Sequence, residues 1–449
     1  MKRKDKVVMF RTLKSPINVQ VEITECCNHI CRHCYNYFRH EDSPRKTMSL
    51  RDLDRLVEEF EKNQIIRVVV TGGEPLVVPD LSLHLIRRCK ESGMGITLNS
   101  NLTLFSERLG LQLRAVGITS IMTSLLSSNA RVHDGITQIP GSWQLATNNI
   151  KLAIKMGFRV LVNMVLTKWN ISTLRDTGDL VGSWGAAKFG ATRACAPGPI
   201  AIGFSQNLIS IRELRDSLTA LYELKKKWGY DVDVFEHYPW CALGDVEKYR
   251  YLARRKCTAG VTSASIGANG EIRPCGHSAL KYGNVLEEGL EKTWARMVDC
   301  RDRQYVERCK ACPHVKFCTG GCQVEEANSS NGQDYHCIGP QGVKTVLINR
   351  LDPVIGENHL FSFVHPIILR QEVFGGILVK AEAGQTLLDK SAFDALSALI
   401  KKDDAVSVST LIKMGATKNE AKKLIVRLSK EGLIKEKKGG GAHDDPDSS

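Results

Sequence analysis

Between Ile17 and about Phe235 the chain repeats one pattern, a short run rich in β-branched residues followed by a longer amphipathic stretch. Six such units follow one another, and a strand–helix repeat of this kind predicts a parallel sheet with right-handed crossovers. The predicted strands begin at Asn18, Ile65, Gly95, Ile118, Arg159 and Ala187, and predicted helices begin at Leu50 and Leu145. We therefore expect an α/β fold, a partial (β/α)6 TIM-like barrel over residues 17–235, with its chemistry at the carboxyl ends of the strands.

The composition changes over residues 236–341, where cysteines crowd together, glycines punctuate the chain and long apolar runs are scarce. The whole chain of 449 residues holds 15 cysteines, an odd number. The basic start, Met1–Phe10, lacks the apolar segment of a secretory signal, so we expect the reducing cytoplasm. A disulfide framework is then the weaker interpretation, and metal ligation by thiolates is the stronger one. We expect metal to hold this domain together.

A third pattern covers residues 358–436. Its predicted elements are a strand–turn–strand around Gly375 and Gly376, a strand from Thr386, and helices from Ser391, Val408 and Thr417. Thr417 and Glu420 together predict a capping box at the last helix. This order is typical of a small winged-helix-like α+β domain, and the low-complexity tail over 437–449 is predicted to be disordered.

Apolar runs in this chain stay far below the length that spans a membrane, so no membrane partner is expected. The formal net charge of +13 permits an acidic partner, but a lysine-rich solvated surface explains it equally well. A nucleic-acid partner is therefore not expected.

Cys27, Cys31 and Cys34 form a C-x3-C-x2-C motif directly after the first predicted strand. Three thiolates on one short loop can hold three corners of a [4Fe–4S] cube and leave the fourth iron open to a substrate. The second predicted strand ends in Thr71-Gly72-Gly73-Glu74-Pro75. Two glycines there allow a close backbone approach, and the carboxylate can accept an ammonium group.

These two motifs, TECCNHICRHCYN and TGGEP, resemble those of the radical S-adenosylmethionine superfamily over roughly the first half of the chain. The resemblance implies that the open iron chelates S-adenosylmethionine, whose reductive cleavage yields a hydrogen-abstracting 5′-deoxyadenosyl radical. It implies an electron donor such as ferredoxin or flavodoxin. It also implies cofactor contacts from Gly72, Gly73, Glu74 and Pro75, from His33 near the adenine, and from Asn99, Ser100, Asn101, Ser124 and Asn163. One departure is Thr137, which follows His133 and Asp134 where similar enzymes often have an arginine.

A second cysteine series runs Cys257, Cys275, Cys309, Cys312, Cys318, Cys322 and Cys337. Two zinc sites are possible on chemical grounds, because zinc also takes four thiolates. The spacing resembles the SPASM domain of radical enzymes that modify peptides, which implies two auxiliary [4Fe–4S] clusters. The resemblance assigns Cys257, Cys275 and Cys322 (the first auxiliary set) to one cluster, and Cys309, Cys312, Cys318 and Cys337 (the second auxiliary set) to the other. For the fourth ligand of the first set, Cys241 is the nearest upstream candidate; otherwise that iron is open.

The segment LRQEVFGGILV, with the helix from Ser391, resembles the RiPP recognition element, a domain related to the peptide chaperone of pyrroloquinoline quinone biosynthesis. This implies a leader peptide that pairs as an added strand. We therefore expect a peptide maturase that forms a thioether or carbon–carbon crosslink. Two alternatives stay open: an anaerobic sulfatase-maturing oxidase, although Gly276 replaces the acid usual there, and an iron–sulfur DNA-binding redox regulator.

Overall fold

The computed structural model describes residues 12–36, 38, 44–195, 204–253, 255–301, 307–328, 334–344, 355–380 and 384–437. The expectations for Met1–Phe10 and for the tail beyond Lys437 lie outside these residues. The chain divides into two compact units, Met1–Ile348 and Asn349–Ser449, and each is described by itself below.

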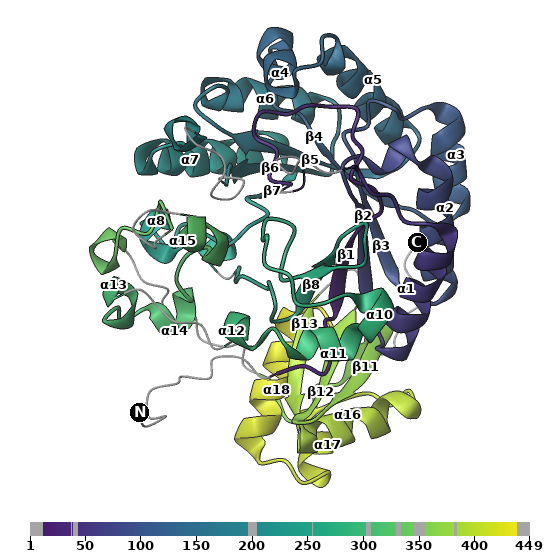
Figure 1. Cartoon of the computed structure of the whole chain (residues 1–449). Coiled ribbons are helices and arrows are strands. Elements are labelled where there is room, and N and C mark those ends of the chain that lie inside the picture. The colour runs from purple at the N-terminus through teal and green to yellow at the C-terminus, as the bar shows by residue number, and fades with distance from the viewer. Residues whose placement is uncertain are drawn as a thin grey trace, which may run out of the picture. The chain divides into compact units, whose positions relative to one another are not determined.

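The first unit is built on one sheet in the order β7-β6-β5-β4-β3-β2-β1-β8-β9 (Figure 1). All neighbouring pairs are parallel except β8 with β9. The strands are β1 (Asn18–Glu22), β2 (Arg67–Thr71), β3 (Gly95–Asn99), β4 (Ser120–Ser124), β5 (Arg159–Leu166), β6 (Lys188–Arg193), β7 (Asp231–Asp233), β8 (Ser263–Ile266) and β9 (Ile272–Arg273). The six predicted strands are confirmed as β1 to β6, and the α/β fold class with them.

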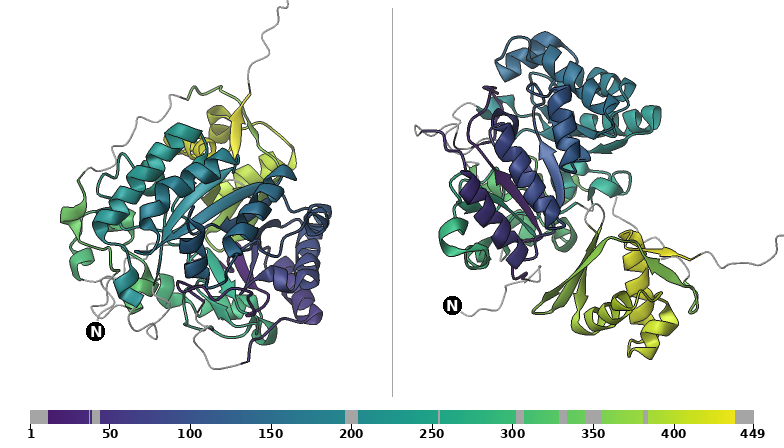
Figure 2. Two further views of the ribbon diagram at one scale, coloured as in Figure 1. Left: turned by 90° about the horizontal axis from the view of Figure 1, so that it is seen from above. Right: turned by 90° about the vertical axis from the view of Figure 1, so that its right-hand side faces the viewer.

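Helices α1 to α7 follow one another around the outer side of this sheet (Figures 1 and 2). They are α1 (Leu50–Lys62), α2 (Pro79–Glu91), α3 (Glu107–Ala115), α4 (Ala130–Thr137), α5 (Ser142–Lys155), α6 (Leu174–Ser183) and α7 (Ile211–Trp228). Helix α1 shows why such segments fold here: Ser49 and Asp52 form a capping box, and Leu53, Leu56, Val57 and Phe60 bury its inner face against the sheet. Among the described residues, no helix is long and apolar enough to cross a membrane.

The cysteine-rich region contributes both to the sheet and to the main core. Strand β8 pairs in parallel with β1, so that Asn18 lies opposite Ser263. Trp294 is fully buried in the same core as the barrel, and its indole N–H donates to the Leu13 carbonyl at 2.8 Å. The helices of the cysteine-rich region are short: α8 (Trp240–Leu243), α9 (Arg250–Ala253), α10 (Val285–Glu288), α11 (Leu290–Ala295), α12 (Val298–Arg301), α13 (Glu307–Lys310), α14 (Val315–Cys318) and α15 (Gln323–Asn328). The boundary between 17–235 and 236–341 stays a prediction from composition, since both stretches belong to one compact unit.

The second unit has a three-stranded antiparallel sheet in the order β11-β12-β13 and a separate pair, β10 with β14. The elements are β10 (Phe361–Phe363), β11 (Ile367–Glu372), β12 (Gly375–Lys380), β13 (Gln385–Asp389), α16 (Lys390–Lys401), α17 (Val408–Lys413), α18 (Lys418–Lys430) and β14 (Ile434–Glu436). The helices pack on the strands around a core that includes Leu378, Leu396 and Ile425 (Figure 2). The predicted strand–turn–strand, the three helices and the Thr417–Glu420 capping box are confirmed.

Candidate functional site

The loop after β1 carries Cys27, Cys31 and Cys34, which we call the loop triad. All three thiols are half-buried and line one cavity. The His29 amide donates to Cys27 Sγ at 3.4 Å, and the amides of Ile30 and Arg32 donate to carbonyls at the end of α4 at 3.1 and 2.9 Å. These backbone bonds hold the loop over the carboxyl ends of the strands, where the sequence predicts the chemistry.

The glycine-rich turn after β2 is packed directly against the cysteine loop. The amides of Gly73 and Glu74 donate to the carbonyls of Thr24 and Cys26 at 2.6 and 2.8 Å. A Cβ atom added at Gly73 would lie 2.2 Å from the Cys26 carbonyl oxygen, and one at Gly72 would lie 2.4 Å from that of Thr24. The glycines are therefore required first by the contact between two segments of the protein itself.

Glu74 lies at the centre of this turn and is buried. Its carboxylate accepts hydrogen bonds from Ser100 Oγ at 2.7 Å, from the Asn101 amide at 2.7 Å and from the Leu76 amide at 2.9 Å. Burial nevertheless raises the pKa of Glu74 to about 7, because desolvation outweighs these bonds. A cationic amine beside this carboxylate would restore the charged form, which fits the contact expected from the sequence.

A cavity of about 500 Å³ joins the two motifs to the other strand ends. Of the residues expected at the cofactor it is lined by Cys27, Cys31, His33, Cys34, Gly73, Glu74, Asn99, Ser100, Asn101, Ser124 and Asn163. Gly72 and Pro75 do not line it. Pro75 is buried and instead opens a 3-10 turn, Pro75–Val77, and Gly72 packs against the Thr24 carbonyl of the cysteine loop. The structure thus brings the predicted residues to one place, with these two in supporting positions.

The chemistry of the cavity wall fits a polar cofactor. Five buried polar atoms of lining residues have no hydrogen-bond partner: His33 Nδ1, Asn36 Oδ1, Asn99 Oδ1, Thr123 Oγ1 and His133 Nε2. Buried polar atoms without partners are rare in folded proteins, and a bound ligand is one source of the missing partners. Together with three thiols on one wall, they form a donor set suited to a cluster and to the polar groups of S-adenosylmethionine.

Two histidines in this wall are held neutral. Burial lowers the pKa of His33 and of His133 to about 4. The Leu126 amide donates to His133 Nδ1 at 3.2 Å, so the ring proton is on Nε2 and faces the cavity. His133 therefore presents an N–H donor in the neighbourhood where similar enzymes often carry an arginine.

One member of the first auxiliary set, Cys275, lines the same cavity together with its neighbours Gly276 and His277. Burial, followed by the charges of Cys322 and Cys257, raises the pKa of Cys275 to about 12, which shows that the three thiols are neighbours. The turn after Cys275 is fixed by the buried Arg273, which donates to the carbonyls of Gly276 and Ser278 at 3.1 Å each. Arg273 also pairs with the buried Glu22 of β1.

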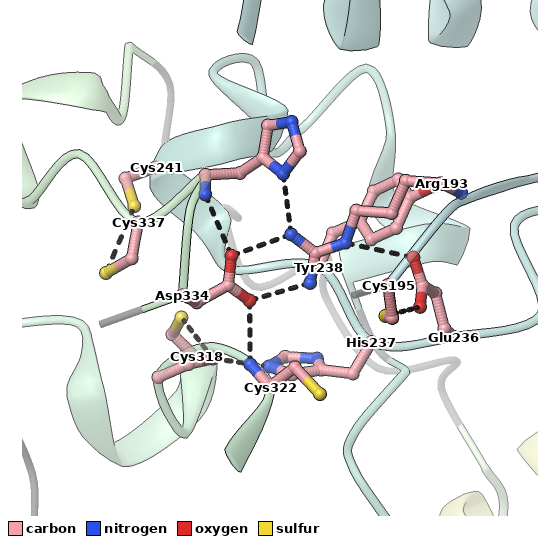
Figure 3. A network of polar contacts seen from close by, with 12 residues as sticks. Arg193, Cys195, Glu236, His237, Tyr238, Cys241, Cys318, Cys322, Asp334 and Cys337 are labelled. Carbon is pink, nitrogen blue, oxygen red and sulfur yellow. Dashed lines mark hydrogen bonds and ion pairs between the residues drawn. The ribbon is translucent and has the colours of Figure 1, made fainter. Parts of the chain in front are cut away.

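A buried network ties the cysteine-rich region to the end of β6 (Figure 3). Arg193 donates to both carboxylate oxygens of Asp334 at 2.6 Å and to Glu236 at 3.0 Å. Asp334 in turn accepts from the Cys322 amide at 2.7 Å, and the Arg193 guanidinium keeps the pKa of Asp334 well below its usual range despite burial. A bidentate charged pair of this kind sets the position of both segments.

The second auxiliary set surrounds a separate small cavity of about 20 Å³, lined by Cys309, Cys312, Cys318 and Cys337. Cys309 Sγ lies 3.6 Å from Cys337 Sγ, and the Trp240 amide donates to Cys318 Sγ at 3.2 Å. Cys241 lines this cavity too, with its Sγ 4.0 Å from that of Cys337. The structure therefore places Cys241 beside the second set, whereas the sequence suggests it for the first. Within the described chain, no three His, Cys, Asp or Glu side chains converge closely enough to hold a single metal ion.

Several residues of the site have little or no signal in the sequence. Asn36, Thr123, Cys195 and Glu236 line the large cavity, but only the fold brings them there. Among them Cys195 stands directly after β6, and that position at a strand end is the one hint that the sequence offers.

Comparison with known proteins agrees with this geometry. A family model described as "Radical SAM superfamily" matches residues 21–181, and one described as "Iron-sulfur cluster-binding domain" (SPASM) matches residues 257–313. The second description answers the zinc alternative in favour of iron–sulfur clusters.

Similar proteins cover about 70% of the chain. The AdoMet-dependent heme synthase of Oleidesulfovibrio alaskensis is 24% identical over 324 residues, covering 68% of this chain and 81% of the relative. The mycofactocin maturase MftC of Mycobacterium tuberculosis is 26% identical over 343 residues, covering 73% and 84%. Streptococcus suis SuiB matches in fold when bound to S-adenosylmethionine (TM-score 0.60, 19% identity, 73% and 78% covered) and when bound to the precursor peptide SuiA (0.58, 18%, 72% and 76%).

Proposed function

The chain carries a radical SAM domain followed by a SPASM iron–sulfur domain, and from this premise we propose that it modifies a precursor peptide by radical chemistry. The observation that carries the proposal is the single cavity lined by the loop triad, by Gly73 and Glu74 and by Cys275 of the first auxiliary set. A substrate in this cavity lies between the group that starts the reaction and the group that accepts electrons afterwards.

The cofactors of this protein are S-adenosylmethionine and three [4Fe–4S] clusters, one that binds S-adenosylmethionine and two auxiliary ones. The cluster at the loop triad, with S-adenosylmethionine bound, would supply one-electron reductive cleavage and abstraction of hydrogen from an unactivated carbon. We assign Cys27, Cys31 and Cys34 to the first cluster, with the auxiliary sets as the sequence groups them.

The chain's own residues bind, orient and exclude water. Glu74 is placed to accept the cofactor amine, while Asn99, Ser124 and Asn163 present polar groups from three consecutive strands, β3, β4 and β5. His133 adds an N–H donor from α4. Since these groups are fixed by backbone and strand, the cofactor binds to a prearranged wall.

A peptide substrate is supported by the maturase relatives and by the second unit. Strands β11 and β13 are the two outer strands of its sheet, each with one side paired to β12. An extended leader peptide can add to such an edge through main-chain hydrogen bonds. We propose that this unit grips the leader while the core peptide enters the cavity.

Lysine substitutions on the two edge strands test leader binding, because a charge on an edge strand opposes strand addition. We expect either Ile368→Lys on β11 or Leu387→Lys on β13 to weaken binding of a fluorescent candidate leader peptide at least about tenfold in anisotropy titrations. Val373→Lys is the matched control, since Val373 is 97% exposed at the turn between β11 and β12. Unchanged affinity in both edge variants would contradict the proposal.

The bond formed is proposed to be a thioether or a carbon–carbon crosslink. Mass spectrometry of a co-expressed candidate peptide should then show a loss of about two daltons, because two hydrogens leave. An unchanged mass with an inverted residue, or a formylglycine product, would replace the crosslink by another modification.

The similarity to AdoMet-dependent heme synthases favours a second candidate, in which the substrate is a heme precursor. Anaerobic assays with a heme precursor and with the candidate peptide in parallel separate the two: only the true substrate should accelerate 5′-deoxyadenosine formation. We propose ferredoxin or flavodoxin as electron donor.

A reducing cytoplasm is proposed because none of the fifteen cysteines, all within the described residues, forms a disulfide.

A further inference from the structure

The first auxiliary set supplies three thiolates, one short of the four that close a [4Fe–4S] cube. Either the fourth iron is open to a substrate, or another residue of the chain completes the set. The upstream candidate, Cys241, is buried on the wall of the other small cavity. Its carbonyl is held there by Arg215 Nη2 at 2.8 Å, and its thiol lies beside Cys337. Cys241 is therefore committed to the neighbourhood of the second set.

Cys195, unlike Cys241, lies close to the first auxiliary set. It follows β6, it is only 4% exposed, and it lines the large cavity together with Cys275. Its thiol lies 3.7 Å from Glu236 Oε2, and the neighbouring thiol of Cys322 is the first cause of its raised pKa. Cys195 thus lies near one member of the first auxiliary set and shares a cavity wall with another.

A buried polar network links the segment that carries Cys195 to the segment that carries Cys322 (Figure 3). Arg193, two residues before Cys195, pairs with Asp334, and Asp334 accepts from the Cys322 amide at 2.7 Å. The Arg193 amide donates to Tyr238 Oη at 3.0 Å, which fixes the strand end from the other side. Two thiols from segments 127 residues apart are therefore brought together by a buried ion pair rather than by chance packing.

We propose that Cys195 is the fourth ligand of the first auxiliary cluster, beside Cys257, Cys275 and Cys322. The thiol proton leaves to solvent as the iron–thiolate bond forms, and no iron of this cluster remains open. The barrel then contributes one ligand and the cysteine-rich region three. A closed cluster at the cavity wall accepts electrons from substrate but does not ligate it. This inference rests on the auxiliary-cluster assignment and not on the identity of the substrate.

The test uses the full-length chain with the loop triad changed to alanine, so that only auxiliary clusters remain. We compare Cys195→Ala, with Cys241→Ala as matched control, by iron content and by EPR of the reduced protein with and without added cyanide. The parent should show no cyanide-dependent signal. Cys195→Ala should either lose about four irons per chain or gain a cyanide-shifted signal from one cluster, while Cys241→Ala should leave the first cluster unchanged.

Cys195→Ser guards against a general folding defect, because a serine oxygen can still ligate iron. It should retain the iron and change the EPR signal and midpoint potential of one cluster only. The proposal is overturned if the parent already binds cyanide, or if both Cys195 variants keep the parental iron content and signals. None of these readouts involves a peptide, so they stay informative even if peptide modification proves wrong.

Discussion

The loop triad and the second auxiliary set use the same thiol chemistry in opposite surroundings. The triad stands on one loop, half-buried, on the wall of a cavity of about 500 Å³ that contains buried polar atoms without partners. The second set draws its thiols from Cys309, Cys312, Cys318 and Cys337 around a cavity of about 20 Å³. Trp240 closes that site, with its amide on Cys318 and its ring stacked on Phe317 at 6.2 Å.

The difference teaches that the surroundings, and not the ligands, decide what a thiolate site can do. A large cavity with polar groups in its wall leaves room for an exchangeable cofactor, whereas a small cavity leaves room for little beyond the cluster, whose potential its surroundings tune. The following changes should separate the two regions, beginning with the largest expected effect.

Cys34→Ala should abolish cleavage of S-adenosylmethionine, lowering 5′-deoxyadenosine formation by at least about a thousandfold, because the triad then holds only two corners of the cluster. The measurement is anaerobic product analysis of reduced, reconstituted protein. Cys89→Ala serves as control, since Cys89 is buried in α2 away from the cavity. Persisting cleavage in Cys34→Ala would remove the basis for the triad as the cofactor site.

Cys312→Ala should act on the other region. We expect formation of the modified product to fall tenfold or more, with reduced solubility, while cleavage of S-adenosylmethionine changes less than about threefold. The reason is that the second set lies in its own cavity, apart from the residues around the cofactor. Parallel quantification of product and of 5′-deoxyadenosine checks this, and equal losses of both would count against an auxiliary role.

Gly73→Ala should lower cleavage about five- to tenfold, because its Cβ would meet the Cys26 carbonyl oxygen at 2.2 Å and displace the cysteine loop. The EPR signals of the auxiliary clusters should stay as in the parent protein. Gly135→Ala is the matched control, since a Cβ at Gly135 in α4 meets nothing within 4 Å. A Gly73→Ala enzyme with normal activity would show that the close approach is dispensable.

The pH dependence of cofactor binding should be the smallest effect. Burial raises the pKa of Glu74 to about 7, so the carboxylate that meets the cofactor amine is progressively lost on acidification. Affinity for S-adenosylmethionine should fall about threefold between pH 7.5 and pH 6.5, measured by equilibrium binding. Glu74→Gln should bind more weakly and show no such slope, and a parental slope in that variant would exclude Glu74 as its origin.

The same shift has a defined sign for stability. The pKa of Glu74 is higher in the folded chain than its ordinary value of 4.5. The contribution of this carboxyl to stability is therefore fully present below about pH 4.5 and is lost as the pH rises through 7. Cofactor binding, which restores the charge with a partner, should reduce this loss.

Much of the fold follows from patterns that are local in the chain. The strand runs from Asn18 to Ala187 predict β1 to β6, and the patterns around Gly375 and from Thr386 predict β11, β12 and β13. Strands β7, β8 and β9 escape prediction because they are short, and because β8 gains its burial only by pairing with β1 across the sequence.

What the sequence by itself determined is the chemistry that sits on single loops: three thiols spaced to share one cluster, and a glycine–glutamate turn one strand away. Only the tertiary structure decided which distant groups complete these sites. Cys195 meets Cys322, Cys241 meets Cys337, and five polar atoms are left to face a ligand. The physical reason is that spacing determines distance within a loop, whereas thiols 96 or 127 residues apart are brought together by core packing and buried ion pairs.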